Sequence, residues 1–131
     1  MKYLLDTSVF LRALAAPDRL NRRARELLSS ARAGLFLSAA SSWEIGVKFA
    51  LGKLDLPEPP ARCVPVWMVR WGIQGLDISH RHALSAGELP AHHQDPFDRV
   101  LIAQAMEEGM AVATADRQFE RYDVELFWCG R

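Results

Sequence analysis

Several features that would narrow the function of a small protein are missing from this sequence of 131 residues. Its two cysteines, Cys63 and Cys129, lie far apart and form no CxxC pair, so neither a zinc ribbon nor a disulfide framework is predicted. No run of about 18 uncharged apolar residues is present to span a membrane. Asp6 and Arg12 interrupt the one stretch that resembles a signal peptide. We therefore expect a cytoplasmic protein that keeps its thiols reduced and has no membrane association.

An excess of charge of one sign is also missing, because 16 Lys and Arg residues balance 16 Asp and Glu residues. This balance excludes a strongly basic domain that binds nucleic acid by bulk electrostatics. The halves differ, however: residues 1–62 hold 10 basic and 6 acidic groups (net +4), and residues 63–131 hold 6 and 10 (net −4). Thirteen of the basic residues are arginine, which suits bidentate phosphate contacts. A selective enzyme acting on nucleic acid remains compatible with this composition.

The chain has no internal repeat, low-complexity tract or long linker. Half of its residues are apolar, and a domain of this length buries roughly two-thirds of the surface of its unfolded chain. We therefore predict one domain over residues 1–131, with a core that needs no disulfide or structural metal.

Short apolar runs alternate with segments of helical periodicity. Strands are predicted at residues 2–5, 35–38, 75–78, 110–114 and 124–127. Helices are predicted at residues 7–15, 20–31, 41–52, 64–71, 79–86 and 96–108, with Pro65 in a first turn and Asp95 as the cap before Pro96. Because the strands are apolar without alternation and are separated by helices, we predict an α/β fold with a parallel sheet covered on both faces.

Four acids occupy positions where this pattern places a strand end or a helix start: Asp6, Glu44, Asp98 and Asp116. In an open parallel sheet, ligands bind beyond the carboxyl ends of the strands. Crowded carboxylates repel one another unless protons or a cation neutralise them. Mg²⁺ or Mn²⁺ prefers oxygen ligands and can activate a bound water against a phosphodiester. The four acids therefore predict a divalent-cation site at one edge of the sheet.

Most of these acids also have a structural interpretation. Asp6 could cap the helix that follows it, and Asp116 could be a turn residue. Asp98 would be favourable near a helix N-terminus because of the helix dipole. The cap accounts for Asp95 fully, so we leave it outside the predicted metal shell. These interpretations do not explain why all four acids lie at the same side of the predicted sheet.

Glu44 has two structural interpretations. It could complete a capping box with Ser41, or it could pair with Lys48 one helical turn later. The aromatic residue beside it, Trp43, is predicted to lie in the core.

The motifs around these acids resemble the PIN domain family, and most closely its VapC-like toxins. They are LLDTS at residues 4–8, SSWEI at 41–45, DPFDR at 95–99 with LIAQA at 101–105, and VATAD at 112–116. Their order and spacing match over essentially the whole chain. The resemblance implies a three-layer α/β/α fold with a central parallel sheet of four to five strands.

The resemblance also implies site residues. The acidic positions of the family fall on Asp6, Glu44, Asp98 and Asp116, the last being the more variable one. The small hydroxyl position beside the first acid falls on Thr7 or Ser8, where a hydroxyl could hold a bound water or a phosphate. These assignments imply that the four acids are catalytic and bind the metal.

The activity implied by the resemblance is that of a metal-dependent endoribonuclease acting on single-stranded RNA segments with Mg²⁺ or Mn²⁺. Products would carry a 5′-phosphate and a 3′-hydroxyl, and Glu44 would be a ligand or the base for a bound water. The resemblance further implies a type II toxin of a VapBC-type pair that forms a homodimer and is blocked by a cognate antitoxin.

Two other functions remain open. One is a non-catalytic PIN-like scaffold that binds RNA or a protein, which the loss of a core acid would favour. The other is a phosphotransferase or phosphatase with Asp6 as nucleophile, but such enzymes carry a second aspartate where Ser8 stands.

Basic residues beside the acids have two interpretations each. Arg99 and Arg117 each follow a candidate acid and could bind a substrate phosphate or pair with a neighbouring acid. His92 and His93 are adjacent and do not share a helical face as HExxH histidines do, so RNA or surface contact is favoured over zinc binding.

Overall fold

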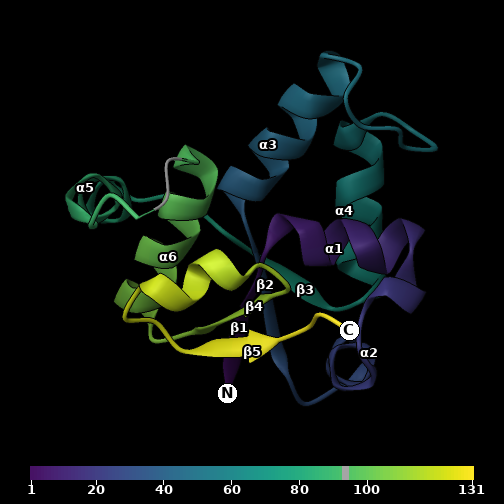
Figure 1. The fold of residues 1–131 in the computed structure, drawn as a ribbon. Coiled ribbons are helices and arrows are strands. Elements are labelled where there is room, and N and C mark those ends of the chain that lie inside the picture. Colours follow the sequence, from purple (N-terminus) through teal and green to yellow (C-terminus); the bar gives the residue numbers. More distant parts are fainter. Residues whose placement is uncertain (93–94) are drawn as a thin grey trace.

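The computed structural model describes residues 1–92 and 95–131, which surround a parallel sheet of five strands in the order β3-β2-β1-β4-β5 (Figure 1). The strands are β1 (Lys2–Leu5), β2 (Gly34–Ser38), β3 (Ile73–Leu76), β4 (Ala111–Thr114) and β5 (Leu126–Trp128). All four pairings are parallel. The carboxyl ends of the strands therefore share one edge of the sheet, as the sequence predicts.

Helices connect these strands. They are α1 (Thr7–Ala15), α2 (Arg22–Ser29), α3 (Ala39–Ala50), α4 (Pro60–Arg70), α5 (His80–Glu88) and α6 (Pro96–Glu108), with short 3₁₀ helices η1 (Pro17–Arg19) and η2 (Arg117–Arg121). In the described residues no helix is long and apolar enough to cross a membrane.

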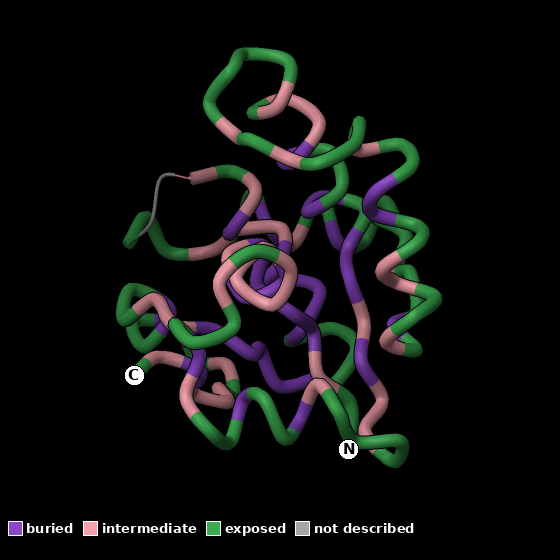
Figure 2. Tube along the Cα trace, turned by 90° about the vertical axis from the view of Figure 1, so that its right-hand side faces the viewer, coloured by how far each residue is buried: buried purple, intermediate pink, exposed green. Residues whose placement is uncertain are grey.

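The sheet is covered on both faces, which confirms the three-layer α/β/α architecture. Adjacent residues of β1 point to opposite faces because side chains alternate along a strand. Leu5 packs into one cluster with Phe10 of α1 and Val64 of α4. Leu4 packs into the other with Leu101 of α6 and Phe119 of η2. Figure 2 shows the buried segments, in purple, gathered in the interior of the molecule.

The start of α3 differs from the prediction. Ser38 is the N-cap and its hydroxyl accepts a hydrogen bond from Ala40 N at 3.0 Å, so the helix begins at Ala39. The prediction that Ser41 and Glu44 form a capping box was therefore wrong. Glu44 lies in the second turn of α3 instead of near its first. The sequence offered several serines as caps, and the true one ends the buried strand β2.

The helix α4 also begins earlier than predicted. It starts at Pro60, which needs no backbone N–H partner at the first helical position. Pro65 consequently lies inside the helix and not in its first turn. The third strand is likewise displaced, to residues 73–76 from the predicted 75–78. The prediction that Trp43 lies in the core was wrong, because its side chain is 65% exposed.

Candidate active site

A pocket of about 210 Å³ lies at the carboxyl edge of the sheet and is lined mainly by acids. Its lining residues are Asp6, Thr7, Ser8, Leu11, Glu44, Lys48, Asp95, Asp98 and Asp116. They come from the ends of β1 and β4 and from α1, α3 and α6, which converge above the sheet in Figure 1. The structure therefore brings the four predicted acids together around one pocket.

Asp6 is fixed by the central strands. Its backbone N–H donates to Ala113 O at 2.9 Å, which extends the pairing of β1 with β4. Its side chain makes no cap hydrogen bond, although Asp6 precedes α1, so the cap interpretation was wrong. Instead Oδ2 accepts hydrogen bonds from Thr114 Oγ1 at 2.7 Å and from Ser8 Oγ at 3.1 Å. Burial raises the pKa of this carboxyl, against the lowering effect of the two hydroxyls.

Glu44 approaches the pocket from α3 and is buried. Its Oε2 accepts from Lys48 Nζ at 2.5 Å, so the predicted pairing exists. This hydrogen bond raises the pKa of Lys48, which lies half-exposed at the pocket. The other oxygen of Glu44, Oε1, is buried without a hydrogen-bond partner among the described residues. Glu44 therefore presents one compensated oxygen and one uncompensated oxygen.

Asp98 is the third residue of α6 and is only 9% exposed. Burial, followed by the charges of Asp6, Asp95, Glu44 and Asp116, raises its pKa to about 8. A nearby helix N-terminus favours a carboxylate, so burial and neighbouring acids outweigh the helix dipole here. The lining holds five acids and one lysine, so one positive charge faces several carboxyl groups in the pocket.

Asp116 and Asp95 each combine a local hydrogen bond with a place in the pocket. Asp116 Oδ1 accepts from Gln118 N at 2.9 Å and caps η2. Asp95 Oδ1 accepts from Phe97 N at 2.9 Å and caps α6, as predicted. Both also line the pocket, so a cap accounts for only part of the position of Asp95.

The two candidate hydroxyls differ in their partners. Thr7 is buried and donates from Oγ1 to Ser41 Oγ at 2.8 Å, which ties α1 to α3. Ser8 donates directly to Asp6. The hydroxyl of Thr114, which sequence reasoning missed, makes the shorter contact with Asp6 and also accepts from Asp116 N at 3.0 Å. Thr114 is the last residue of β4, two residues before Asp116, and this position in the sequence could have identified it as a site residue.

The guanidinium of Arg99 contacts three backbone carbonyls. It donates to Pro90 O at 3.0 Å and to Ala86 O and Leu89 O at 2.9 Å each. These bonds satisfy carbonyls at and beyond the end of α5, which otherwise have no helical partner. Arg99 thereby holds the end of α5 against the start of α6.

Arg117 lies at the surface beside the pocket. Its Nη1 pairs with Glu120 Oε1 at 2.8 Å, and its guanidinium lies 4.3 Å from the ring centroid of Trp128. His92 is exposed and packs edge-to-face against Tyr122, with centroids 5.4 Å apart. His93 lies outside the described residues. The predicted pairing of Arg117 with a neighbouring acid is thus confirmed, and the acid is Glu120.

The donor chemistry of the pocket suits a hard divalent cation. Every acid in the lining offers oxygen, which Mg²⁺ and Mn²⁺ prefer. A positive charge would compensate both the unpartnered Oε1 of Glu44 and the repulsion that raises the pKa of Asp98. As placed, no group of three or more such side chains within residues 1–92 and 95–131 is arranged to hold a metal ion. The residues therefore fit a cation by type, and binding it requires side-chain movement.

Comparison with known proteins gives a consistent family. The model of the PIN domain matches residues 3–125. Ribonuclease VapC16 from Mycobacterium tuberculosis is 43% identical over 67 residues, so the match spans about half of this chain (51%) and about half of that relative (47%).

Solved structures share the fold. VapBC2 from Rickettsia felis, bound to a DNA fragment of its promoter, matches with a TM-score of 0.74 at 20% identity and covers 98% of this chain and 99% of that one. VapBC-1 from nontypeable Haemophilus influenzae matches with a TM-score of 0.69 at 19% identity over 98% of each chain. Because the model of the PIN domain matches residues 3–125, well over half of the sequence, the chain belongs to the PIN domain family.

Proposed function

We propose that the protein is a Mg²⁺- or Mn²⁺-dependent endoribonuclease that hydrolyses single-stranded RNA segments. One observation carries this proposal: four acids from distant parts of the sequence line one pocket in which a single lysine supplies balancing charge. The family match and the likeness to Ribonuclease VapC16 support a nuclease. The likeness to VapBC complexes supports a toxin that pairs with an antitoxin.

In this proposal Asp6, Asp98 and Asp116 hold the cation, and Glu44 is a further ligand or the base for the attacking water. When bound, the cation supplies activation of a water molecule and stabilisation of the departing oxygen. Thr114 and Ser8 orient the carboxylate of Asp6 through their hydroxyls.

The reaction follows from attack by water on phosphorus. Water gives a proton to a carboxylate as the new P–O bond forms and the bond from phosphorus to the 3′-oxygen breaks. The departing 3′-oxygen takes up a proton from solvent, and the carboxylate returns its proton to solvent. The products then carry a 5′-phosphate and a 3′-hydroxyl. No nucleophilic side chain is required, which separates this mechanism from a phosphotransferase that uses Asp6.

The same proposal includes partners and setting. The protein forms a homodimer in the cytoplasm, and a cognate antitoxin covers the acid-lined pocket. The candidates for substrate contact are exposed Arg117, half-buried Ser8 and the buried hydroxyl of Thr7, while Arg99 acts by positioning α6.

The experiment compares wild type with Asp6→Asn on a labelled single-stranded RNA, in EDTA and with Mn²⁺ restored. Wild type should cleave only with the cation, and Asp6→Asn should lose cleavage while keeping its circular dichroism spectrum. Asp55→Asn is the matched control, because Asp55 is exposed and away from the pocket. Retained cation-stimulated cleavage by Asp6→Asn would overturn the proposal, and it would favour a site elsewhere on the chain.

A further inference from the structure

A contact between exposed Trp43 and half-buried Phe97 joins the two helices that carry Glu44 and Asp98. Trp43 of α3 is 65% exposed, whereas large aromatic side chains are mostly buried. Its ring packs edge-to-face on Phe97 at the start of α6, with centroids 5.0 Å apart and planes at 75°. Single exposed apolar residues are common, but this one has a fixed aromatic neighbour. The contact holds the indole in place while leaving most of its surface open.

The position of the pair is set by the acids. Trp43 directly precedes Glu44, and Phe97 directly precedes Asp98. Neighbouring Cα atoms are about 3.8 Å apart, so each ring starts within one residue of a pocket-lining carboxylate. Neither ring belongs to the pocket lining itself. The pair therefore bridges the two helices that supply two of the acids, one residue from each acid.

Because the pocket is acidic, an RNA substrate needs a further contact outside it. Five acids and one lysine line it, so a polyanion gains little attraction from these side chains. A pocket of about 210 Å³ has room for a phosphate and its waters, while the bases of a polynucleotide stay outside it. Stacking of an unpaired base on an aromatic side chain contributes about 1–3 kcal/mol and tolerates any base. The exposed indole of Trp43, one residue from Glu44, offers this contact.

We propose that Trp43, held by Phe97, is a stacking platform for an unpaired base next to the phosphate that enters the acid-lined pocket. The proposal rests on the proposed function, and it adds the contact by which the substrate is recognised as single-stranded. A base in a duplex is already stacked and paired, so it cannot use this surface. Single-strand preference then follows from Trp43 more than from the acids.

A protein surface is the competing use of an exposed tryptophan, since tryptophan anchors protein interfaces. The base is favoured here because the indole lies one residue from a site carboxylate. An apolar hollow more typical of a protein contact lies elsewhere, around Trp71 and Leu28. The test below separates the two uses.

The experiment measures binding without turnover, in an Asp6→Asn background. The probes are a fluorescein-labelled octamer of uridylate and the same ribose–phosphate octamer lacking all bases, each followed by anisotropy. Trp43→Ala should weaken binding of the uridylate octamer about 5- to 150-fold and should leave the abasic octamer unchanged. Trp43→Phe should keep most of the affinity. Leu84→Ala, at an equally exposed residue of α5, is the control and should bind as the parent does.

A purely structural role of Trp43 would weaken both octamers equally, and that result would overturn the proposal. Equal binding of uridylate by Trp43→Ala and its parent would also overturn it. The same holds if Trp43→Ala loses binding to an antitoxin and keeps its binding to the uridylate octamer. These results would leave the nuclease proposal intact. If the parent binds neither octamer while wild type cleaves no RNA, the proposed function itself fails. Failure of the platform and failure of the function are therefore distinguishable.

Discussion

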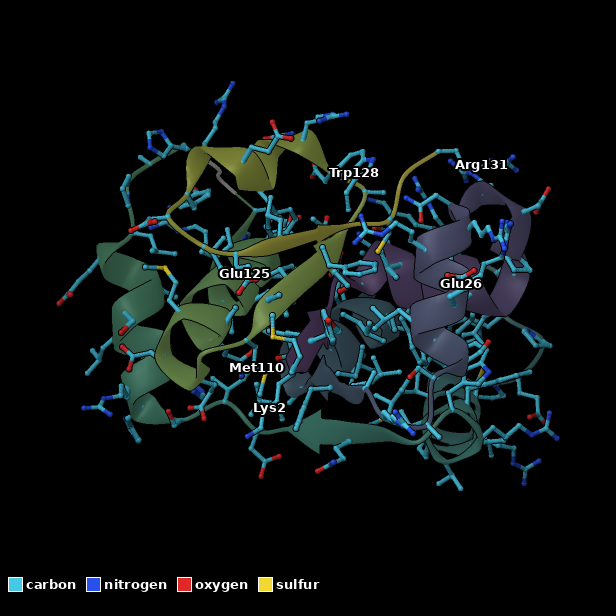
Figure 3. All side chains as sticks on the ribbon, turned by 90° about the horizontal axis from the view of Figure 1, so that it is seen from below. Lys2, Glu26, Met110, Glu125, Trp128 and Arg131 are labelled. Carbon is cyan, nitrogen blue, oxygen red and sulfur yellow. The ribbon has the colours of Figure 1, made fainter. Side chains whose placement is uncertain are left out.

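The two edges of the sheet differ in whether their charged side chains are buried or exposed. At the carboxyl edge Asp6, Glu44 and Asp98 are buried among one another, and one oxygen of Glu44 has no hydrogen-bond partner in the described structure. At the amino edge, seen from below in Figure 3, charged side chains such as Lys2 and Glu26 extend into solvent. A hollow of about 410 Å³ near this end is lined by side chains of both charges.

This difference indicates where the fold gives up stability for function. Burial of acids without full compensation lowers the free energy of unfolding, and folded domains have only about 5–15 kcal/mol in reserve. The amino edge carries no such burden, because exposed ion pairs change stability little. We attribute the arrangement at the carboxyl edge to the cation that the proposed function places there.

The largest expected effect comes from neutralising one acid at the carboxyl edge, compared with neutralising one acid near the amino edge. Glu44→Gln should lower the cleavage rate about 10²–10⁴-fold, as expected for loss of a base or cation ligand. Glu26→Gln, the matched change near the amino edge, should cleave as wild type does. Single-turnover cleavage of one RNA by the three proteins measures this. Equal rates for Glu44→Gln and Glu26→Gln would break the distinction between the two edges.

The second effect is a dependence of stability on pH. The pKa of Asp98 is raised from 3.8 to about 8, so between these values the folded protein holds a proton that the unfolded chain has released. Because the folded state binds more protons, the free energy of unfolding falls as pH rises, by at most about 1.4 kcal/mol per pH unit for one group. Asp6, whose pKa is also raised, adds to the same trend.

Urea denaturation in EDTA from pH 5 to pH 8 measures this slope. We expect wild type to lose stability across the range and Asp98→Asn to lose less. Asp55→Asn should follow wild type. A slope in Asp98→Asn as steep as in wild type would show that the pH dependence arises elsewhere.

The smallest effect concerns the hydroxyl that orients Asp6. Thr114→Val removes the donor at 2.7 Å from Oδ2 and should destabilise the protein by about 1–2 kcal/mol. It should also raise the pKa of Asp6 further, because one of the hydrogen bonds that favour the charged form is lost. Thermal denaturation checks the stability. Ser85→Ala, which removes an exposed hydroxyl bonded to Glu107, is the control and should have little effect.

Local sequence signals predicted much of this fold. The apolar run at residues 2–5, and Asp95 before Pro96, gave the first strand and the start of α6 correctly because each depends on adjacent residues. The convergence of the acids followed from the parallel sheet, whose strand ends share one edge.

The predictions that were wrong, or that were not made, depend on contacts between distant segments. Ser38 and not Ser41 caps α3 because β2 ends there, and Ser41 instead accepts from Thr7 across 34 residues. Arg99 bonds carbonyls around the end of α5, which only the packing of α5 on α6 brings near it. Trp43 is apolar and was expected inside, yet the rotation of α3 that buries Glu44 turns it outward. One sequence cannot reveal which partner each residue meets.

The most direct test of the central claim is the free energy of unfolding at pH 8 as a function of Mn²⁺ concentration. It needs no knowledge of the RNA target. Wild type should gain stability with the cation, by about 2.7 kcal/mol at 100 times the dissociation constant, and Asp6→Asn should gain far less. An equal gain in both proteins, or none in wild type, would contradict a cation site at the carboxyl edge.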